Sequence, residues 1–163
     1  MSTPPSTPTS AERRLAELGL ELPPPPAAVA AFEPYRRDGD AVYVSGQVAA
    51  RDGRMVATGR LGAGLDVATG QAAARVCALN VLAQLRAAAG DLDGVAALVR
   101  ITVYVAGDPD FTEQPKVADG ASQLFIDVLG DAGRHARAAI GVAGLPLGSP
   151  VEVDAIARLR PAA

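Results

Sequence analysis

Residues 136–158 read ARAAIGVAGLPLGSPVEVDAIAR, and this stretch decides the fold. Two apolar runs, 136–142 and 151–158, flank the turn-forming residues 145–148, which predicts two strands joined by a tight connection. In the second run the apolar residues alternate with Glu152 and Asp154. We therefore expect one face of this strand in the core and its two carboxylates on the other face.

The same periodicity predicts the remaining elements upstream. A strand is expected over 41–48, followed by a turn at 51–54 and a returning strand at 55–57. A further strand is expected over 98–106, with Val99, Ile101, Val103 and Val105 on one face. Apolar residues at helical spacing predict a helix over 69–89, and a second helix from Thr112 or Gln114 to Leu129. Two long helices among four or five strands predict an α+β fold, with both helices on one face of the sheet. The other sheet face then needs cover, for which an oligomer is the natural solution.

The N-terminal region has a different composition from the rest of the chain. Residues 1–9 are mostly Ser, Thr and Pro, and disorder is expected there. Residues 10–27 are expected to form a short helix, with Ser10 as its N-cap and Gly19 at its end, followed by a proline-rich linker. We therefore divide the chain into a tail (1–9), a helix and linker (10–27) and one domain (28–163).

Composition excludes several classes of function. The net charge is −3, and no basic stripe of the kind that binds nucleic acid is present. Cys77 is the only cysteine and His135 the only histidine, so a metal site built from such ligands is not expected. Cys77 is expected to be a core thiol. The sequence has no signal peptide and no run long enough to span a membrane, so a cytoplasmic location is expected.

Three segments in order carry a family resemblance. The first runs from Tyr35 to the Ser-Gly-Gln of residues 45–47, and the second is LVRITVYVAGDPDF at 98–111. The third combines Ala-Arg at 136–137, Leu-Pro at 145–146 and VEVDAIA at 151–157. This ordered set resembles the reactive-intermediate (imine) deaminase family, also called RidA/YjgF and formerly endoribonuclease L-PSP. The N-terminal extension is similar to a longer branch of that family.

The resemblance implies a chorismate-mutase-like fold, with a mixed sheet and two helices on one face, a homotrimer and ligand sites in the clefts between subunits. The implied activity resembles that of a 2-iminobutanoate/2-iminopropanoate deaminase, the cofactor-free hydrolysis of 2-imino acids to 2-keto acids and ammonia. The residue matching Arg137 would grip the substrate carboxylate through its planar fork, assisted by the backbone N–H of Ala139. Glu152 would position the attacking water.

The resemblance also implies roles for residues around these groups. Tyr35 would line the site, and Ser45 and Gly46 would form a backbone wall. His135 lies two residues before Arg137 and could reach the mouth of the pocket. Asp119 departs from the family pattern, which tends to have asparagine there. An aspartate adds negative charge near a carboxylate site unless it points to Arg137, and it could favour a ligand that carries an amine.

Two other functions stay open at this level. One is a non-catalytic trimer that senses or sequesters a small carboxylate or amide metabolite, which the aspartate at position 119 favours. The other is ribonuclease activity, the older family label, which the acidic balance of the chain disfavours.

Overall fold

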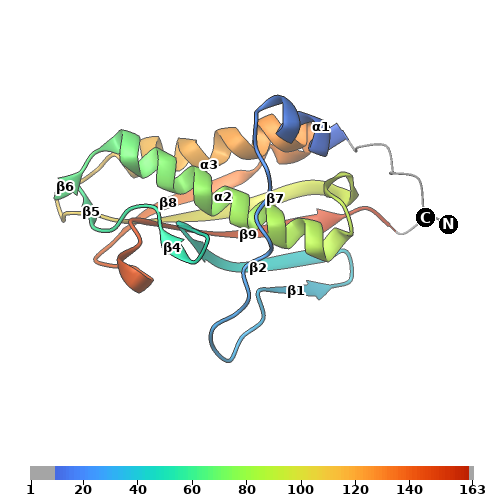
Figure 1. Ribbon diagram of the computed structural model, residues 1–163, viewed down its shortest axis with the longest axis horizontal. Coiled ribbons are helices and arrows are strands. Elements are labelled where there is room, and N and C mark those ends of the chain that lie inside the picture. Colours follow the sequence, from blue (N-terminus) through green and yellow to red (C-terminus); the bar gives the residue numbers. More distant parts are fainter. Residues whose placement is uncertain (1–9, 162–163) are drawn as a thin grey trace.

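A five-stranded sheet forms the centre of the molecule in the computed structural model, which describes residues 10–161 (Figure 1). Its strand order is β1-β2-β9-β7-β8, in which only β7 and β8 are parallel neighbours. The strands are β1 (Tyr35–Asp38), β2 (Ala41–Val48), β7 (Val95–Ala106), β8 (Ala136–Val142) and β9 (Val151–Leu159). The helices are α1 (Ser10–Glu17), α2 (Val67–Ala89) and α3 (Gln114–Leu129). The predicted α+β fold is confirmed.

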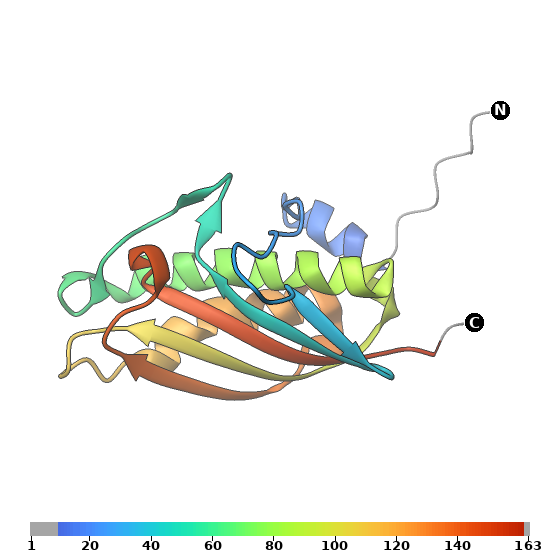
Figure 2. The same ribbon diagram turned by 90° about the horizontal axis from the view of Figure 1, so that it is seen from below.

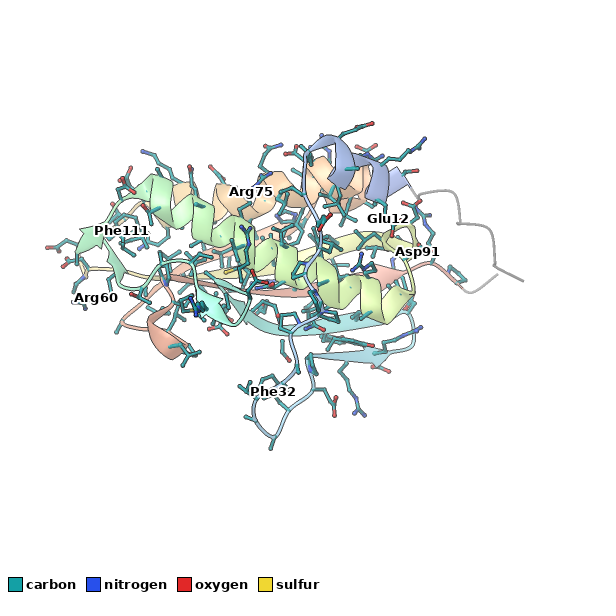
Figure 3. All side chains as sticks on the ribbon, in the orientation of Figure 1. Glu12, Phe32, Arg60, Arg75, Asp91 and Phe111 are labelled. Atoms are coloured by element: carbon teal, nitrogen blue, oxygen red, sulfur yellow. The ribbon has the colours of Figure 1, made fainter. Side chains whose placement is uncertain are left out.

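Short elements complete the chain. They are β3 (Ala50–Arg51), β4 (Arg54–Met55), β5 (Arg60–Leu61), β6 (Gly64–Leu65) and the 3₁₀ turns η1 (Leu92–Gly94), η2 (Gly130–Gly133) and η3 (Pro146–Gly148). The hairpin of β3 and β4 turns at Asp52 and Gly53, both at positive φ, which matches the twist of the strands that they join. Phe111 packs over the turn of β5 and β6, where its side chain lies 3.3 Å from a Cβ placed on Gly62 (Figure 3).

Connection geometry explains why the two long helices share one sheet face. The chain runs from β2 through α2 to β7, and from β7 through α3 to β8. Both crossovers join strands of the same direction and both progress the same way along the sheet. Because such crossovers are right-handed, α2 and α3 lie on the same face (Figure 2). No element within residues 10–161 covers the opposite face, here called the open face.

The core lies between the sheet and these two helices. Helix α2 is buried on most of its surface because the sheet, α3 and the N-terminal segment surround it. Two buried side-chain amides on α2 form hydrogen bonds to the backbone of neighbouring segments. Asn80 donates to the carbonyls of Val48 and Ala50, and Gln84 donates to that of Pro26. Cys77 is fully buried, as predicted, and its burial raises the pKa of the thiol well above its ordinary value. None of the helices within residues 10–161 is both long and apolar enough for a bilayer.

The N-terminal helix belongs to the same core. Ala11 and Leu15 are buried in the same core cluster as residues of the sheet and of the two long helices. The carboxylate of Asp93 accepts from the backbone N–H groups of Ser10 and Ala11, which caps α1 from a distant part of the chain. Gly19, at positive φ, ends the helix as expected. The disorder expected for residues 1–9 concerns a segment outside the described residues.

One predicted face is wrong. Val99 was expected beside Ile101 in the core, but it is exposed. The pairing of β7 with β9 shifts register between Leu98 and Arg100, so an irregularity inserts one residue and turns Val99 outward. Strand β1 and the ladder of β5 and β6 were not predicted, because their short sequences lack a readable alternation.

The crossing of α2 and α3 depends on a glycine. A Cβ placed on Gly120 would lie 2.3 Å from the backbone carbonyl oxygen of Gln71, so the helices approach too closely for any side chain there. Helix propensity alone predicts that Gly120→Ala stabilises the protein by about 1 kcal/mol. We predict instead a loss of about 2 kcal/mol in the free energy of unfolding, since backbone must move to relieve the overlap.

Urea unfolding of Gly120→Ala and of Gly144→Ala tests this prediction. Gly144 has no positive φ, and no atom lies within 4 Å of the position that an added methyl group would occupy. Its alanine variant is therefore the control and should change stability little. A Gly120→Ala protein as stable as the wild type would contradict the close helix approach.

Candidate functional site

Arg137 lies on β8, an edge strand of the sheet, and its side chain turns toward α3. One terminal nitrogen, Nη1, donates to Oδ1 of Asp119 at 2.8 Å and to Oγ of Ser122 at 3.2 Å. Asp119 and Ser122 are three residues apart on α3 and therefore share one helix face. The Arg137 side chain is 24% exposed and that of Asp119 is 62% exposed. The guanidinium is thus held at the protein surface with one side still open.

The remaining donors of Arg137 are available to a ligand. Neither Nε nor Nη2 has a hydrogen-bond partner among residues 10–161. These two nitrogens form one edge of the guanidinium, whose N–H bonds match the two oxygens of a carboxylate. Arg137 is therefore fixed through Nη1 and presents an unused fork.

The backbone of β8 adds a donor on the same side. Gly107 donates to the carbonyl of Val142, so Val142 directs its backbone groups toward β7. In a parallel ladder alternate residues point their backbone groups to opposite sides. It follows that the N–H of Ala139 points away from β7, to the free edge next to Arg137.

His135 joins this cluster through Ser122. Its Nδ1 lies 2.6 Å from the carbonyl oxygen of Gly133, which can only accept, so Nδ1 carries the proton. In the neutral ring Nε2 then accepts from the Ser122 hydroxyl at 2.9 Å, and the Ser122 oxygen accepts from Arg137. Burial lowers the pKa of His135, the charge of Arg137 lowers it further, and the bond to Gly133 opposes both. His135 is thus linked to Arg137 through the Ser122 hydroxyl.

A second cluster lies on the open face of the sheet. Strand β2 shifts register against β9 between Val44 and Gln47, which is a β-bulge centred on Ser45 and Gly46. The carboxylate of Glu152 rests directly on Gly46, because a Cβ placed there would lie 2.0 Å from Oε1 of Glu152. Burial raises the pKa of Glu152, and the charge of Asp154 adds to that effect.

Asp154 is held by neighbours on β7. Its Oδ2 accepts from the Tyr104 hydroxyl at 2.8 Å, and its Oδ1 accepts from the backbone N–H of Thr102 at 3.3 Å. The hydrogen bond to Asp154 raises the pKa of Tyr104. A depression of about 320 Å³ opens beside these residues and is lined in part by Ser45, Gly46 and Arg100. The open face therefore carries a hollow, a half-buried glutamate and a fixed aspartate.

The structure separates the predicted site residues into two groups. Arg137, Ala139, Asp119 and His135 lie together at the edge of β8 and α3. Ser45, Gly46 and Glu152 lie together on the open face, with β7 between the two groups. Within one chain the groups face opposite sides of the sheet, so they do not form a single site.

Tyr35 belongs to neither group. It pairs with Val44 across β1 and β2, and directly opposed residues point to the same face. Val44 is buried beneath the helices, and Tyr35 packs against that core. Its side chain is thus on the opposite face from Glu152.

Two contributing residues were not anticipated. Ser122 links His135 to Arg137, and Tyr104 holds Asp154. Ser122 could have been found from its spacing of three residues from Asp119 on a predicted helix. Tyr104 gave no such signal, because its partner comes from a strand 50 residues later.

Comparison with known proteins gives consistent matches along the chain. A family model described as "YjgF/chorismate_mutase-like, putative endoribonuclease" matches residues 12–159. Protein TCP17 of Trypanosoma cruzi is 49% identical over 146 residues, which is 89% of this chain and 91% of that protein. Protein Atu1372 of Agrobacterium tumefaciens, of unknown function, is 44% identical with a TM-score of 0.85, and the match covers 92% of each chain. The structure of E. coli TdcF with bound serine is 25% identical with a TM-score of 0.63, covering 85% of this chain and 94% of that one.

The environment of His135 predicts a pH dependence of stability. The folded-state pKa lies below the ordinary value of 6.5, so below that value the unfolded chain takes up the proton more readily than the folded protein does. The stability that the neutral ring provides is therefore present above pH 6.5 and is lost as the pH falls through the folded-state pKa. His135→Asn, which cannot titrate, should lose less stability than the wild type between about pH 7.5 and about pH 5.5.

Urea unfolding at both pH values measures the difference between the two proteins. Comparing slopes with pH, rather than absolute stabilities, removes any uniform cost of the substitution. Parallel losses in the wild type and in His135→Asn would contradict the prediction.

Proposed function

The chain belongs to the YjgF/chorismate mutase-like family, and we propose that it hydrolyses small 2-imino acids, or their enamine tautomers, to 2-keto acids and ammonia. The site would lie between subunits of a homotrimer. The observation that carries this proposal is the unused fork of Arg137, Nε and Nη2, beside the outward N–H of Ala139. Such a set of donors suits a small carboxylate.

Arg137 and Ala139 would bind and orient the substrate. Two parallel bonds from the guanidinium fix the plane of the carboxylate, and the amide of Ala139 adds a third donor. The α-carbon, which carries the C=N bond, is then held at a set distance from the edge of β8. Orientation of this kind removes much of the entropic barrier to attack by water. The structural neighbour TdcF carries bound serine, which is a small carboxylate, and this supports a small carboxylate as the ligand proposed here.

Glu152 would act as the general base. It takes a proton from water as the oxygen bonds to the imine carbon, and the nitrogen, protonated as an iminium, takes up the electron pair of the C=N bond. The protonated Glu152 then gives its proton to that nitrogen. As the carbon–nitrogen bond breaks to release ammonia, the hydroxyl group loses its proton to the Glu152 carboxylate and becomes the carbonyl, and the departing ammonia takes that proton from Glu152 as ammonium. A raised pKa suits this double role. A carboxyl group whose pKa lies closer to the working pH can accept a proton from water and then return it to the nitrogen.

The separation of the two groups supports a site shared between subunits. Arg137 lies at the edge of one subunit, whereas Glu152 lies on the open face beside Gly46. If the β8 edge of one subunit docked against the open face of the next, Arg137 of the first subunit would approach Glu152 of the second. The same docking would also cover the exposed apolar residues Tyr43 and Ile140. Tyr35 keeps its place on the helix side, and its role in the site stays a prediction.

One observation favours a second function. The ion pair of Asp119 with Arg137 offsets the positive charge that would attract a carboxylate. A non-catalytic trimer that binds a small metabolite needs no fast turnover. It would therefore tolerate competition between Asp119 and the ligand carboxylate for the charge of Arg137. Ribonuclease activity has no comparable support, since the net charge is −3 and the open face holds two carboxylates.

The proposed hydrolysis predicts that Arg137→Ala loses activity on 2-imino acids. An amino-acid oxidase would generate these compounds in place, and release of 2-keto acid would be followed with time. We expect a loss of about 100-fold or more in kcat/KM, as two charge-assisted bonds are removed. Arg134→Ala is the matched control, because Arg134 is an exposed arginine paired with Asp131 and should retain full activity. Equal activity in the wild type and Arg137→Ala would refute the assignment, and no turnover by the wild type would favour the binding protein.

A shared site makes a further prediction for mixed subunits. Arg137→Ala and Glu152→Gln should each be inactive alone, but trimers reassembled from equal amounts should recover activity. With random mixing, about a quarter of the interfaces pair an intact arginine with an intact glutamate. Recovery of about a quarter of wild-type activity is therefore expected, measured in the same assay after denaturation and refolding together. Mixtures that stay inactive, while refolded wild type regains activity, would contradict a site built from two subunits.

A further inference from the structure

We propose that Ser122 is a nucleophile activated by His135, and that it accepts acyl groups from esters with a phenol or enol leaving group. The Ser122 hydroxyl oxygen lies 2.9 Å from Nε2 of His135, and Nδ1 of the same ring lies 2.6 Å from the carbonyl oxygen of Gly133. A hydroxyl, an imidazole and an acceptor behind the imidazole are thus connected by hydrogen bonds. This is the arrangement that activates serine for acyl transfer. The reaction is separate from the proposed hydrolysis of imines.

The direction of these bonds leaves His135 ready to accept a proton. The carbonyl oxygen of Gly133 can only accept, so the proton of the neutral ring is on Nδ1 and Nε2 has a free lone pair. Burial lowers the pKa of His135, so the ring is neutral at pH 7. The ring of Phe125 meets that of His135 edge-on, with ring centroids 5.9 Å apart, and limits its rotation. His135 is therefore a fixed base that faces one hydroxyl.

Ser122 does not make the bond that is common for a serine inside a helix. Such a hydroxyl often donates to the carbonyl four residues earlier, which here belongs to Ala118. Among residues 10–161, Ser122 donates instead to His135, which comes 13 residues later in the chain. Because Ser122 is partly exposed, solvent could satisfy its hydroxyl without the histidine. The pairing of serine with base is thus more specific than hydrogen-bond satisfaction requires.

The Ser122 oxygen keeps one lone pair for attack on an acyl carbon. A hydroxyl oxygen has two acceptor lone pairs. Nη1 of Arg137 uses one of them at 3.2 Å, and no other group among the described residues donates to the second. Asp119, three residues earlier on α3, has a side chain that is 62% exposed, so this part of the helix is open to solvent. A small ester can therefore reach the nucleophile.

In the acylation step, Oγ of Ser122 bonds to the ester carbonyl carbon and its proton passes to Nε2 of His135. The electron pair of the C=O bond moves onto the carbonyl oxygen, near the positive charge of Arg137. When this pair returns, the bond to the leaving oxygen breaks, and that oxygen takes the proton from Nε2. Water then attacks the acyl carbon and gives a proton to Nε2. Oγ leaves and recovers that proton as the carboxylic acid is released.

The charges around the pair determine the class of ester. The intermediate combines an oxyanion with a protonated His135, and the uncharged carbonyl of Gly133 stabilises that cation less than a carboxylate would. The charge of Arg137 disfavours the same cation. A carbonyl carbon made electron-poor by a phenol or enol oxygen still forms this intermediate readily, whereas alkyl esters and amides do not. Phenol and enol esters are therefore the expected substrates.

Incubation of the full-length protein with 4-nitrophenyl acetate tests the proposal. We expect a burst of nitrophenolate of about one equivalent per chain, followed by slower turnover as water removes the acetyl group. Mass spectrometry of the quenched protein should find one added acetyl group, on the α3 peptide that contains Ser122. Absence of nitrophenolate release would overturn the proposal. Acetyl groups on Lys116 or the N-terminus alone, with release unchanged in Ser122→Ala, would overturn it as well.

Variants assign the two roles. Ser122→Ala should lose the burst and the acetyl label, whereas Ser122→Cys keeps a nucleophile beside His135 and should be labelled. His135→Asn should be acetylated about 100-fold or more slowly, because no base takes the proton, and an unchanged rate would refute the role of the histidine. Ser10→Ala is the matched control, since Ser10 is a partly exposed serine on α1 and the His135 bond goes to Ser122. It should be labelled like the wild type.

Two separate assays distinguish this proposal from imine hydrolysis. Nitrophenolate release reports on Ser122, and release of 2-keto acid reports on Arg137 and Glu152. A protein that hydrolyses imines but is not acetylated on Ser122 would refute the nucleophile and leave the proposed function intact. A protein that is acetylated on Ser122 but does not hydrolyse imines would support the nucleophile and refute the proposed hydrolysis.

Discussion

The fixed hand of the β-α-β crossovers is the constraint on which the rest of the structure depends. Two successive crossovers progress in one direction along the sheet and so place α2 and α3 on one face. Strand β9 returns antiparallel between β2 and β7, with its apolar residues beneath the helices and Glu152 and Asp154 on the other side. The open face thus carries carboxylates as a direct result of chain topology, and the edge strand β8 is left free to present Arg137.

Much of this arrangement could be predicted from alternation and helical spacing. The strict alternation of 151–158 identified β9 and its two faces, and the ends of α2 and α3 were marked by Gly90 and Gly130. The error at Val99 has a physical cause, because a register shift depends on the partner strand, which comes about 60 residues later in the chain. Local sequence does not record that pairing.

The candidate site was predictable as a set of residues and not as an arrangement. The family resemblance named Arg137 and Glu152 together, but only the sheet order shows that they lie on opposite faces of one chain. The contacts that position them come from residues with no motif of their own. Ser122 orients Arg137 from α3, and the missing side chain of Gly46 makes room for Glu152. Such roles depend on distance in space, which spacing along one chain does not give.

The ion pair at the edge of β8 contributes little to stability, and its main effect is to fix the position of the Arg137 guanidinium. An exposed ion pair adds about 0–1 kcal/mol to the free energy of unfolding, and this one uses Nη1 alone, so the Nε and Nη2 edge of Arg137 stays unpaired among the described residues. Ser122 and His135 hold the arginine from the other side without adding charge, since the lowered pKa keeps His135 neutral at pH 7. The balance of charge at the fork therefore depends on Asp119, whose carboxylate offsets the charge of Arg137.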